Sequence, residues 1–155
     1  TKIEILKKAA IQSIKNDDPV WFGCDVGKYL HRSHGIMDID LFDFDLFYDT
    51  KFTMDKATRL EYGESKMTHA MLFTGVDVVD GKPRRWRVEN SWGAEQSGRK
   101  GFYTMNDSWY DEQMFEIACP SKYLSDEMKA GMMTEPVVLP AWDPMGSLAK
   151  DEAFQ

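Results

Sequence analysis

Two β-prone segments joined by an Asp-Gly pair constrain the fold of this chain more than any other feature. The first, residues 68–79, is rich in Val, Phe and Thr, and the second, residues 85–89, alternates charged and apolar side chains. An Asp-Gly pair is typical of a tight turn between paired strands because both residue types tolerate positive φ. The sequence therefore predicts a long antiparallel hairpin whose turn covers residues 80–83 and whose second strand has two unlike faces.

Further helices and strands are expected on both sides of this hairpin. A helix is predicted to begin at a Thr1–Glu4 capping box, to follow apolar residues at helical spacing and to stop before Pro19. Residues 28–51 show no clean period, so short helix and loop are expected there. The remaining expected elements are strands at 20–24, 101–105 and 113–118, helices at 55–64 and 125–130, and a short helix or turn beginning at 106–108. This pattern predicts an α+β fold with a mainly antiparallel sheet.

Length and charge limit the classes of protein to which the chain can belong. Its 155 residues suit one domain, and a hydrophobic share of 43% allows a sizeable core. The formal net charge of −7 disfavours a polyanionic partner, so nucleic-acid binding by this segment is not expected. No apolar run reaches the roughly 18 residues that a membrane helix needs. Two cysteines are too few for a disulfide scaffold, which favours a reducing, cytoplasmic location.

A proline-rich stretch divides the chain into a body and an arm. Pro136, Pro140 and Pro144 recur at a spacing that excludes both a helix and a central strand. We therefore expect residues 1–134 to form the folded body and residues 135–155 to form an extended arm lying on a surface.

His69 and Asn90 form the pair of side chains most suited to catalysis. His69 stands at the start of the first hairpin strand and Asn90 follows the end of the second, so the two are expected to be neighbours. An Asn oxygen that accepts a hydrogen bond from one ring nitrogen fixes the tautomer and rotation of the imidazole, and aims the other nitrogen at a thiol. Trp92 is expected to cover this hydrogen bond, and Gly93 lets the chain turn beside the ring. Taken singly, a His on a strand or a Trp is more often a core residue.

Several motifs resemble the papain-like cysteine proteases, and within them the cytosolic cysteine aminopeptidases. Asn-Ser-Trp-Gly at residues 90–93, followed by Gly-Phe-Tyr at 101–103, resembles the asparagine segment of that family. Thr-His-Ala-Met at residues 68–71 resembles its histidine strand. Further resemblances lie at residues 21–28, 62–65 and 139–146, so the likeness runs over nearly the whole chain.

The resemblance implies a peptidase with a helical half and a β-rich half, of which this chain corresponds to the C-terminal third. The expected fold is a twisted sheet, partly closed like a barrel, with flanking helices. The resemblance also implies that His69 is the base and acid, that Asn90 orients it and that Trp92 shields their bond, with no cofactor. Substrates would be peptides with a free N-terminus, and the family assembles as a homohexamer.

Neither cysteine of the chain is expected to be the nucleophile. Cys24 lies in the middle of a hydrophobic strand, and the matching family segment carries a Cys that is not the nucleophile. Cys119 precedes Pro120 at the end of a strand, with no His or Asn motif around it. The resemblance places the nucleophile and its oxyanion hole near the start of the full protein, so this chain alone is expected to be inactive.

The resemblance also implies a role for the arm. In this family the arm lies in the active-site cleft, where its terminal carboxylate meets the amino group of the substrate and makes the enzyme an aminopeptidase. Family members end at about Lys150, whereas this chain continues to Gln155. The added residues would clash with the cleft, be trimmed or swing outward.

Two clusters of potential ligands suggest a metal ion, but neither has a suitable spacing, and no metal site is expected. A zinc site would use Cys24, His31, His34 and Asp38, which match no standard zinc module. A calcium loop would use acids that lack the Gly and closing Glu of an EF-hand, so a solvated loop is favoured. These acids are Asp38, Asp40, Asp43 and Asp45.

A small basic cluster keeps a second class of function open. Residues 84–87 combine three Arg with one Trp, and on an acidic chain they are expected to be an alternating strand face. The alternative to peptide hydrolysis is therefore a non-catalytic module that serves in assembly or in nucleic-acid interaction.

Overall fold

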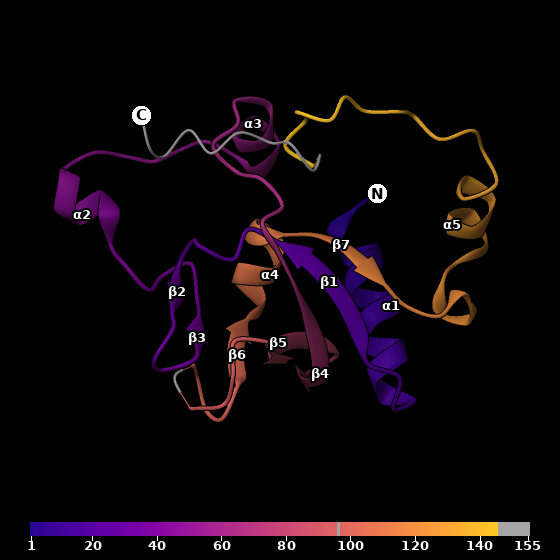
Figure 1. The fold of residues 1–155 in the computed structure, drawn as a ribbon, viewed down its shortest axis with the longest axis horizontal. Coiled ribbons are helices and arrows are strands. Elements are labelled where there is room, and N and C mark those ends of the chain that lie inside the picture. The colour runs from indigo at the N-terminus through magenta and orange to yellow at the C-terminus, as the bar shows by residue number, and fades with distance from the viewer. Residues whose placement is uncertain (96, 146–155) are drawn as a thin grey trace.

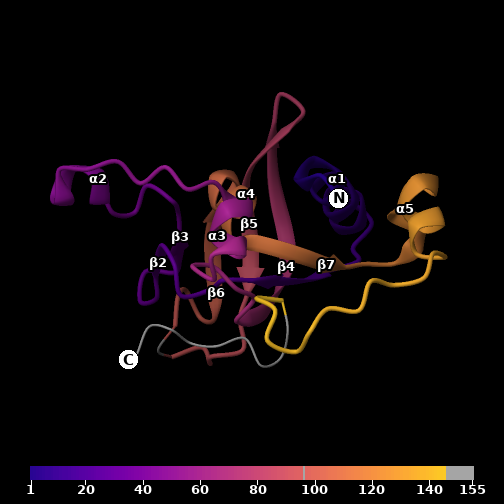
Figure 2. The ribbon, with the colours of Figure 1, turned by 90° about the horizontal axis from the view of Figure 1, so that it is seen from above.

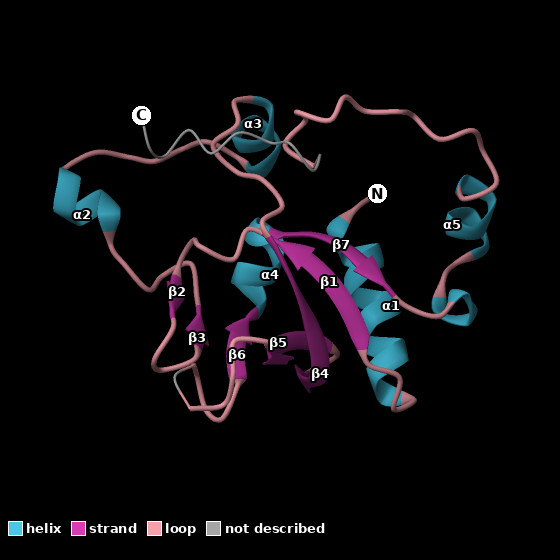
Figure 3. Cartoon of the chain, viewed as in Figure 1, coloured by secondary structure: helices cyan, strands magenta, loops and turns pink. Residues whose placement is uncertain are grey.

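A computed structural model describes residues 1–95 and 97–145 of the protein (Figures 1 and 3). The strands are β1 (Val20–Cys24), β2 (Leu30–His31), β3 (Ile36–Met37), β4 (His69–Val79), β5 (Lys82–Glu89), β6 (Phe102–Asn106) and β7 (Met114–Ala118). The helices are α1 (Ile3–Lys15), α2 (Phe44–Tyr48), α3 (Lys56–Glu61), α4 (Asp107–Gln113) and α5 (Asp126–Gly131), with a 3₁₀ turn η1 (Ser121–Tyr123).

The strands form one curled sheet in the order β2-β3-β6-β5-β4-β1-β7. All neighbouring strands are antiparallel except β3 and β6, which run parallel. The curl closes the sheet into a half-barrel with helices around it, which confirms the expected α+β class and the barrel-like, mainly antiparallel sheet.

The predicted hairpin lies at the centre of this sheet. Asp80 (φ 50°) and Gly81 (φ 77°) make a two-residue left-handed turn between β4 and β5. The expected four-residue turn is wrong, because Lys82 and Pro83 already belong to β5. Pro83 fits in the strand because the register of the pairing shifts at Val78, directly opposite, and a residue without an N–H costs the sheet little at a bulge.

The core is an aromatic stack that joins the hairpin to α4. The rings of Phe22 and Phe73 are stacked with centroids 3.8 Å apart, which ties β1 to β4. The ring of Tyr110, on α4, lies 5.3 Å from Phe73 and 4.8 Å from Trp86. All four residues are buried, so this stack fixes the sheet against the helix that precedes β7.

Helix α1 packs across β4, β1 and β7 and is joined to α4 by an ion pair whose lysine is buried. Lys7 is only 8% exposed, and its Nζ lies 2.7 Å from Asp107 Oδ2 and 2.6 Å from Asp111 Oδ1. Asp107 also accepts a hydrogen bond of 2.9 Å from the indole of Trp86. A single ammonium group therefore links α1, α4 and the centre of the sheet.

The first turn of α1 differs from the sequence prediction. The N-cap residue is Lys2, which is extended and makes no side-chain capping bond, so the Thr1–Glu4 capping box is wrong. The helix starts one residue too late for the Thr1 side chain to reach its free N–H groups. The end of α1 at Asn16, ahead of Pro19, agrees with the prediction.

Residues 28–51 contain two short strands that the sequence pattern did not reveal. β2 and β3 have two residues each, too few to show a period, and β3 continues the sheet beyond β6. The turn between them requires Gly35, whose φ is 66° and whose added Cβ would lie 2.8 Å from Gly98 Cα. The expected short helix in this segment is α2.

The proline-rich arm is described as far as residue 145. Residues 135–145 form neither helix nor strand, as the proline spacing predicts. The rest of the expected arm, including Gly146 and the residues after Lys150, lies outside the described residues.

The Lys7 ion pair predicts a specific loss of stability. Replacing Lys7 with Met removes the counter-charge from two carboxylates and should lower the free energy of unfolding by about 2 kcal/mol, measured by urea denaturation. The matched control is Lys8→Met, one residue on and exposed, which should change it by less than about 0.5 kcal/mol. Equal midpoints for the two variants would show that the ion pair contributes nothing.

Candidate active site

The structure brings His69 and Asn90 into direct contact. His69 is the first residue of β4 and Asn90 directly follows β5, so the hairpin pairing sets the two side by side. His69 Nε2 lies 2.9 Å from Asn90 Oδ1, a normal hydrogen-bond length. Asn90 is 9% exposed, whereas His69 is half-buried. The amide is thus held inside the protein and the imidazole reaches its surface.

The orientation of the Asn90 amide is fixed by its own backbone. The N–H of Ser91 donates a 2.8 Å hydrogen bond to Asn90 Oδ1, and the N–H of Asn90 donates to Gly101 O at 3.0 Å. Because a backbone N–H can only donate, the group that faces it must be the amide oxygen. That same oxygen faces His69, so neutral His69 carries its hydrogen on Nε2 and leaves Nδ1 as the basic nitrogen.

The second ring nitrogen of His69 is open. Nδ1 forms no hydrogen bond with any residue in the described part of the chain. A nitrogen with a free lone pair, on a ring whose rotation is held from the other side, is suited to taking a proton from an incoming group. Asn90 Nδ2 is likewise buried without a partner among the described residues.

Trp92 packs against the imidazole of His69. The two ring centroids are 4.9 Å apart and the planes are tilted by 30°. The guanidinium of Arg32 lies 4.8 Å from the centre of the indole, a cation–π contact that joins the loop after β2 to the site. Gly93 follows with φ 89°, a conformation that favours glycine. Nothing in the sequence pattern pointed to Arg32, because its partner is 60 residues away.

In the described residues, neither cysteine makes a hydrogen bond to the imidazole of His69. Cys24 lies opposite His69 in the β1–β4 pairing, but its Sγ contacts the backbone oxygen of His69, at 3.6 Å, and is fully buried. Burial raises the pKa of the Cys24 thiol, and the neighbouring Asp25 carboxylate raises it further. Cys119 directly follows β7, and partial burial raises its thiol pKa as well. Cys24 is therefore the core residue that the sequence predicted.

The segment just before His69 is held in place by hydrogen bonds. Thr68 Oγ1 accepts a 3.1 Å hydrogen bond from the N–H of Val26. The buried carboxylate of Asp25 accepts one of 3.0 Å from Ser65. Two residues before His69, the N–H of Met67 donates to Pro144 O at 3.2 Å. The proline-rich arm thus contacts the segment just before the strand that carries His69.

The potential metal ligands are dispersed or engaged elsewhere. His31 and His34 stack edge to face, whereas Cys24 is buried in the core. Asp43 caps α2, and Asp45 binds Lys51 Nζ at 3.0 Å. Within residues 1–95 and 97–145, no group of three or more His, Cys, Asp or Glu side chains is placed to hold a metal ion.

The basic cluster on β5 is occupied by local contacts. Arg84 donates to Asp77 at 2.8 Å, and the guanidinium of Arg87 lies 3.8 Å from the centre of the Phe102 ring. These contacts agree with an alternating strand face. None of the helices in the described residues is long and apolar enough to cross a membrane.

Comparison with known proteins relates the chain to one peptidase family. Residues 1–146 match the model of the Peptidase C1-like family. The chain is 47% identical over 148 residues to aminopeptidase C of Listeria monocytogenes, covering 96% of this chain and 33% of that protein. It is 47% identical over 152 residues to bleomycin hydrolase of Homo sapiens, with the same coverage. The chain therefore spans about a third of the length of these relatives, their C-terminal third.

A solved structure shows the same fold. The crystal structure of PepW from Lactobacillus rhamnosis superposes with a TM-score of 0.88 at 45% sequence identity, over 94% of this chain and 33% of that one. The predicted resemblance to papain-like aminopeptidases is confirmed by these matches.

Burial predicts that the Cys24 thiol is inert in the folded protein. A buried thiol with a raised pKa is scarcely ionised at pH 8, so iodoacetamide should not label Cys24 until the protein is unfolded. Mass spectrometry of the alkylated peptides, with and without urea, measures this. The half-buried Cys119 serves as the internal control and should react faster. Labelling of native Cys24 at the rate of Cys119 would contradict a structural role.

Proposed function

Because this chain belongs to the Peptidase C1-like family, we propose that it supplies the histidine and asparagine of a cysteine peptidase whose nucleophilic thiol lies in the preceding part of the polypeptide. The observation that carries the proposal is the 2.9 Å contact between His69 Nε2 and Asn90 Oδ1, with Nδ1 left open. Within the described residues neither Cys24 nor Cys119 makes a hydrogen bond to the imidazole, and burial raises the pKa of both thiols, so the 155-residue chain alone is expected to be inactive.

His69 would act first as a base and then as an acid. Its Nδ1 takes the proton of the incoming thiol, and the resulting thiolate and imidazolium stabilise each other. The thiolate attacks the carbonyl carbon of the scissile peptide, and the imidazolium gives its proton to the leaving amine. In the second half of the reaction Nδ1 takes a proton from water, whose oxygen attacks the carbonyl carbon of the thioester. The carbon–sulfur bond then breaks, the acid is released, and the sulfur leaves as a thiolate beside the imidazolium.

Asn90 and Trp92 would act through His69. The Asn90 oxygen accepts the Nε2 hydrogen in both the neutral and the charged ring. It therefore keeps the imidazole of His69 in the same orientation throughout the reaction cycle. As a neutral acceptor it holds the ring without adding a charge. Trp92 packs on the imidazole and limits the access of water to this hydrogen bond, which strengthens it.

The arm supports an aminopeptidase rather than an endopeptidase. The bond from Met67 to Pro144 brings the arm within two residues of His69. An arm that lies beside the catalytic residues blocks long substrates and leaves room for an N-terminal residue, and relatives of this chain are named aminopeptidases. Peptides with a free N-terminus are thus the proposed substrates.

The homohexamer and the cytoplasmic location expected from the resemblance stay predictions, as does the alternative of a nucleic-acid or assembly module.

Loss of the imidazole should abolish turnover. In the full-length protein, His69→Ala should lower kcat for an aminoacyl substrate by at least about a thousandfold, because it removes both the base and the acid. The fold should survive, checked by circular dichroism. The matched control is His34→Ala, an exposed imidazole outside the site, which should retain full activity. A His69→Ala enzyme with a near-normal rate would refute the proposal.

Loss of the amide should act on the rate rather than on binding. Asn90→Ala frees the imidazole to rotate and should lower kcat by about a hundredfold, the lower end of what a positioned acid–base contributes, with KM nearly unchanged. Initial-rate kinetics on the full-length protein measures both constants. An effect confined to KM would mean that Asn90 contacts the substrate and does not position His69.

A further inference from the structure

A shallow pocket of about 470 Å³ lies on the outer face of the sheet, over β4, β5 and β6. It is lined by Arg85 and Arg87 of β5 and by Arg99 of the loop that precedes β6. All three arginines are exposed, whereas Trp86 and Val88 of the same strand are buried. Strand alternation thus sets two guanidinium groups on the face opposite the core, and the loop adds a third.

The three guanidinium groups form no ion pair with any acid among residues 1–95 and 97–145. Among the described residues that line the pocket, one carries a carboxylate: Asp77, the cross-strand neighbour of Arg85. This carboxylate is already bound by Arg84, whose Nε lies 2.8 Å and whose Nη2 lies 2.7 Å from Asp77 Oδ2. The lining of the pocket therefore has a surplus of positive charge.

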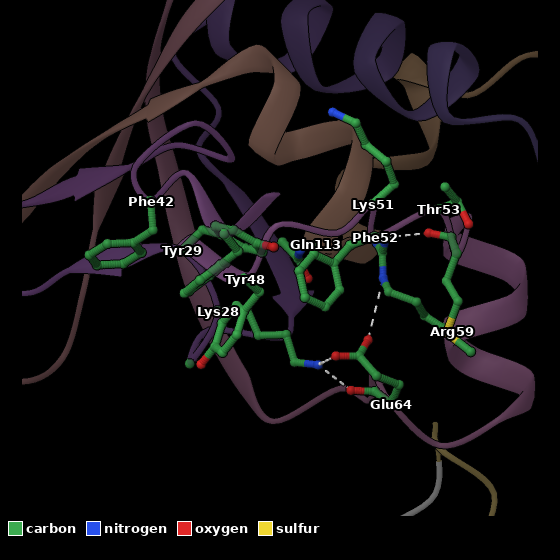
Figure 4. Close-up of a pocket in the computed structure, with 13 residues that line it drawn as sticks. Lys28, Tyr29, Phe42, Tyr48, Lys51, Phe52, Thr53, Arg59, Glu64 and Gln113 are labelled. Carbon is green, nitrogen blue, oxygen red and sulfur yellow. Dashed lines mark hydrogen bonds and ion pairs between the residues drawn. The ribbon is translucent and has the colours of Figure 1, made fainter. Parts of the chain in front are cut away.

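A larger cavity of about 750 Å³ differs in this respect, because the cations that line it are paired (Figure 4). Lys28 and Arg59 both form ion pairs with Glu64. Lys51 binds Asp45 at 3.0 Å. With 26 Asp and Glu against 19 Lys and Arg, the chain has enough carboxylates to pair its cations. Three neighbouring arginines without one repel each other, which favours a counter-charge from outside the chain.

Arg87 is held in a defined position within the pocket. Its guanidinium lies 3.8 Å from the centre of the Phe102 ring, and a guanidinium over an aromatic ring still has its N–H groups to donate. On β4 its cross-strand partner is Gly75, where an added Cβ would lie 3.3 Å from Arg87 Cβ and crowd it. On β6 its partner is Thr104, which lines the pocket and adds a hydroxyl donor.

We propose that this pocket binds a small oxyanion of the phosphate class that carries two or more negative charges. Guanidinium groups bind phosphate oxygens through paired N–H donors. Arg85 and Arg87 are two residues apart on one strand, about 7 Å, so one anion between them reaches both. The volume falls in the range of small-molecule sites, about 300–1,000 Å³. The proposal is independent of the proposed function, because it uses neither His69 nor Asn90.

The charge of the chain favours a small anion over a long one. At physiological ionic strength exposed charges are screened over about 8 Å, so the three guanidinium groups dominate the field inside the pocket. A nucleic acid would extend beyond them over a chain of net charge −7, and Glu89 follows on the same face of β5. A single carboxylate carries one charge and would neutralise one of the three cations.

Isothermal titration calorimetry of the full-length protein at low ionic strength tests the site, with inorganic phosphate and pyrophosphate as probes. We expect saturable binding of both, tighter for pyrophosphate because it carries more charge. Arg99→Gln and Arg85→Gln should each weaken pyrophosphate binding by about fivefold, the loss expected for one exposed charge pair. Both side chains are exposed, so the fold should survive, which circular dichroism checks.

The matched control is Lys82→Gln, which removes one positive charge from the same strand without touching the pocket. Lys82 is the first residue of β5 and follows the β4–β5 turn, which projects beyond the rest of the sheet in Figure 2. Its loss should change the affinity for pyrophosphate by less than about twofold, because it lies outside the pocket and is screened.

Three results would overturn the proposal. The absence of saturable binding for both anions would show that the arginines are only solvated. Equal losses in Lys82→Gln and Arg99→Gln would mean diffuse attraction to a basic strand and no defined site. Tighter binding of a short DNA duplex than of pyrophosphate, weakened by the same arginine substitutions, would assign these arginines to nucleic acid.

Discussion

The backbone pairing of β4 with β5 is the interaction on which the candidate site depends. It brings the first residue of one strand next to the residue that follows the other, so His69 meets Asn90 without a long or strained connection. The side-chain oxygen of Asn90 also accepts a hydrogen bond from the N–H of Ser91, and the backbone N–H of Asn90 donates to Gly101 O. Because the imidazole is held through Nε2 by a group that cannot rotate, its basic nitrogen has a defined direction.

The rest of the fold keeps this hairpin rigid. The stacked rings of Phe22, Phe73 and Tyr110 pack β1 and α4 against the hairpin. Lys7 joins α1 to α4 through ion pairs with Asp107 and Asp111. These contacts lie in the core, away from the imidazole surface. The protein can therefore leave one face of His69 open, as the proposed enzyme requires, without loss of order around the site.

In the proposed enzyme the open face of His69 is only one part of the catalytic centre. The thiol of Cys24, opposite His69 in the sheet, is buried and protonated. It therefore does not take the place of a nucleophile from another part of the polypeptide. In the proposed enzyme this chain contributes orientation and proton transfer, whereas the preceding part contributes the reactive sulfur.

The amino-acid sequence by itself determined the hairpin, the pairing of His69 with Asn90 and the core position of Cys24, because turn chemistry and strand alternation are local signals. It missed the start of α1, the short strands β2 and β3 and the place of Pro83, where single residues rather than a period decide the structure. Only the tertiary structure decided the Lys7 ion pair and the contact of Arg32 with Trp92. The first joins Lys7 to residues 100 and 104 positions further along the chain, and the second joins residues 60 positions apart. Such contacts depend on how the sheet curls, which no local pattern encodes.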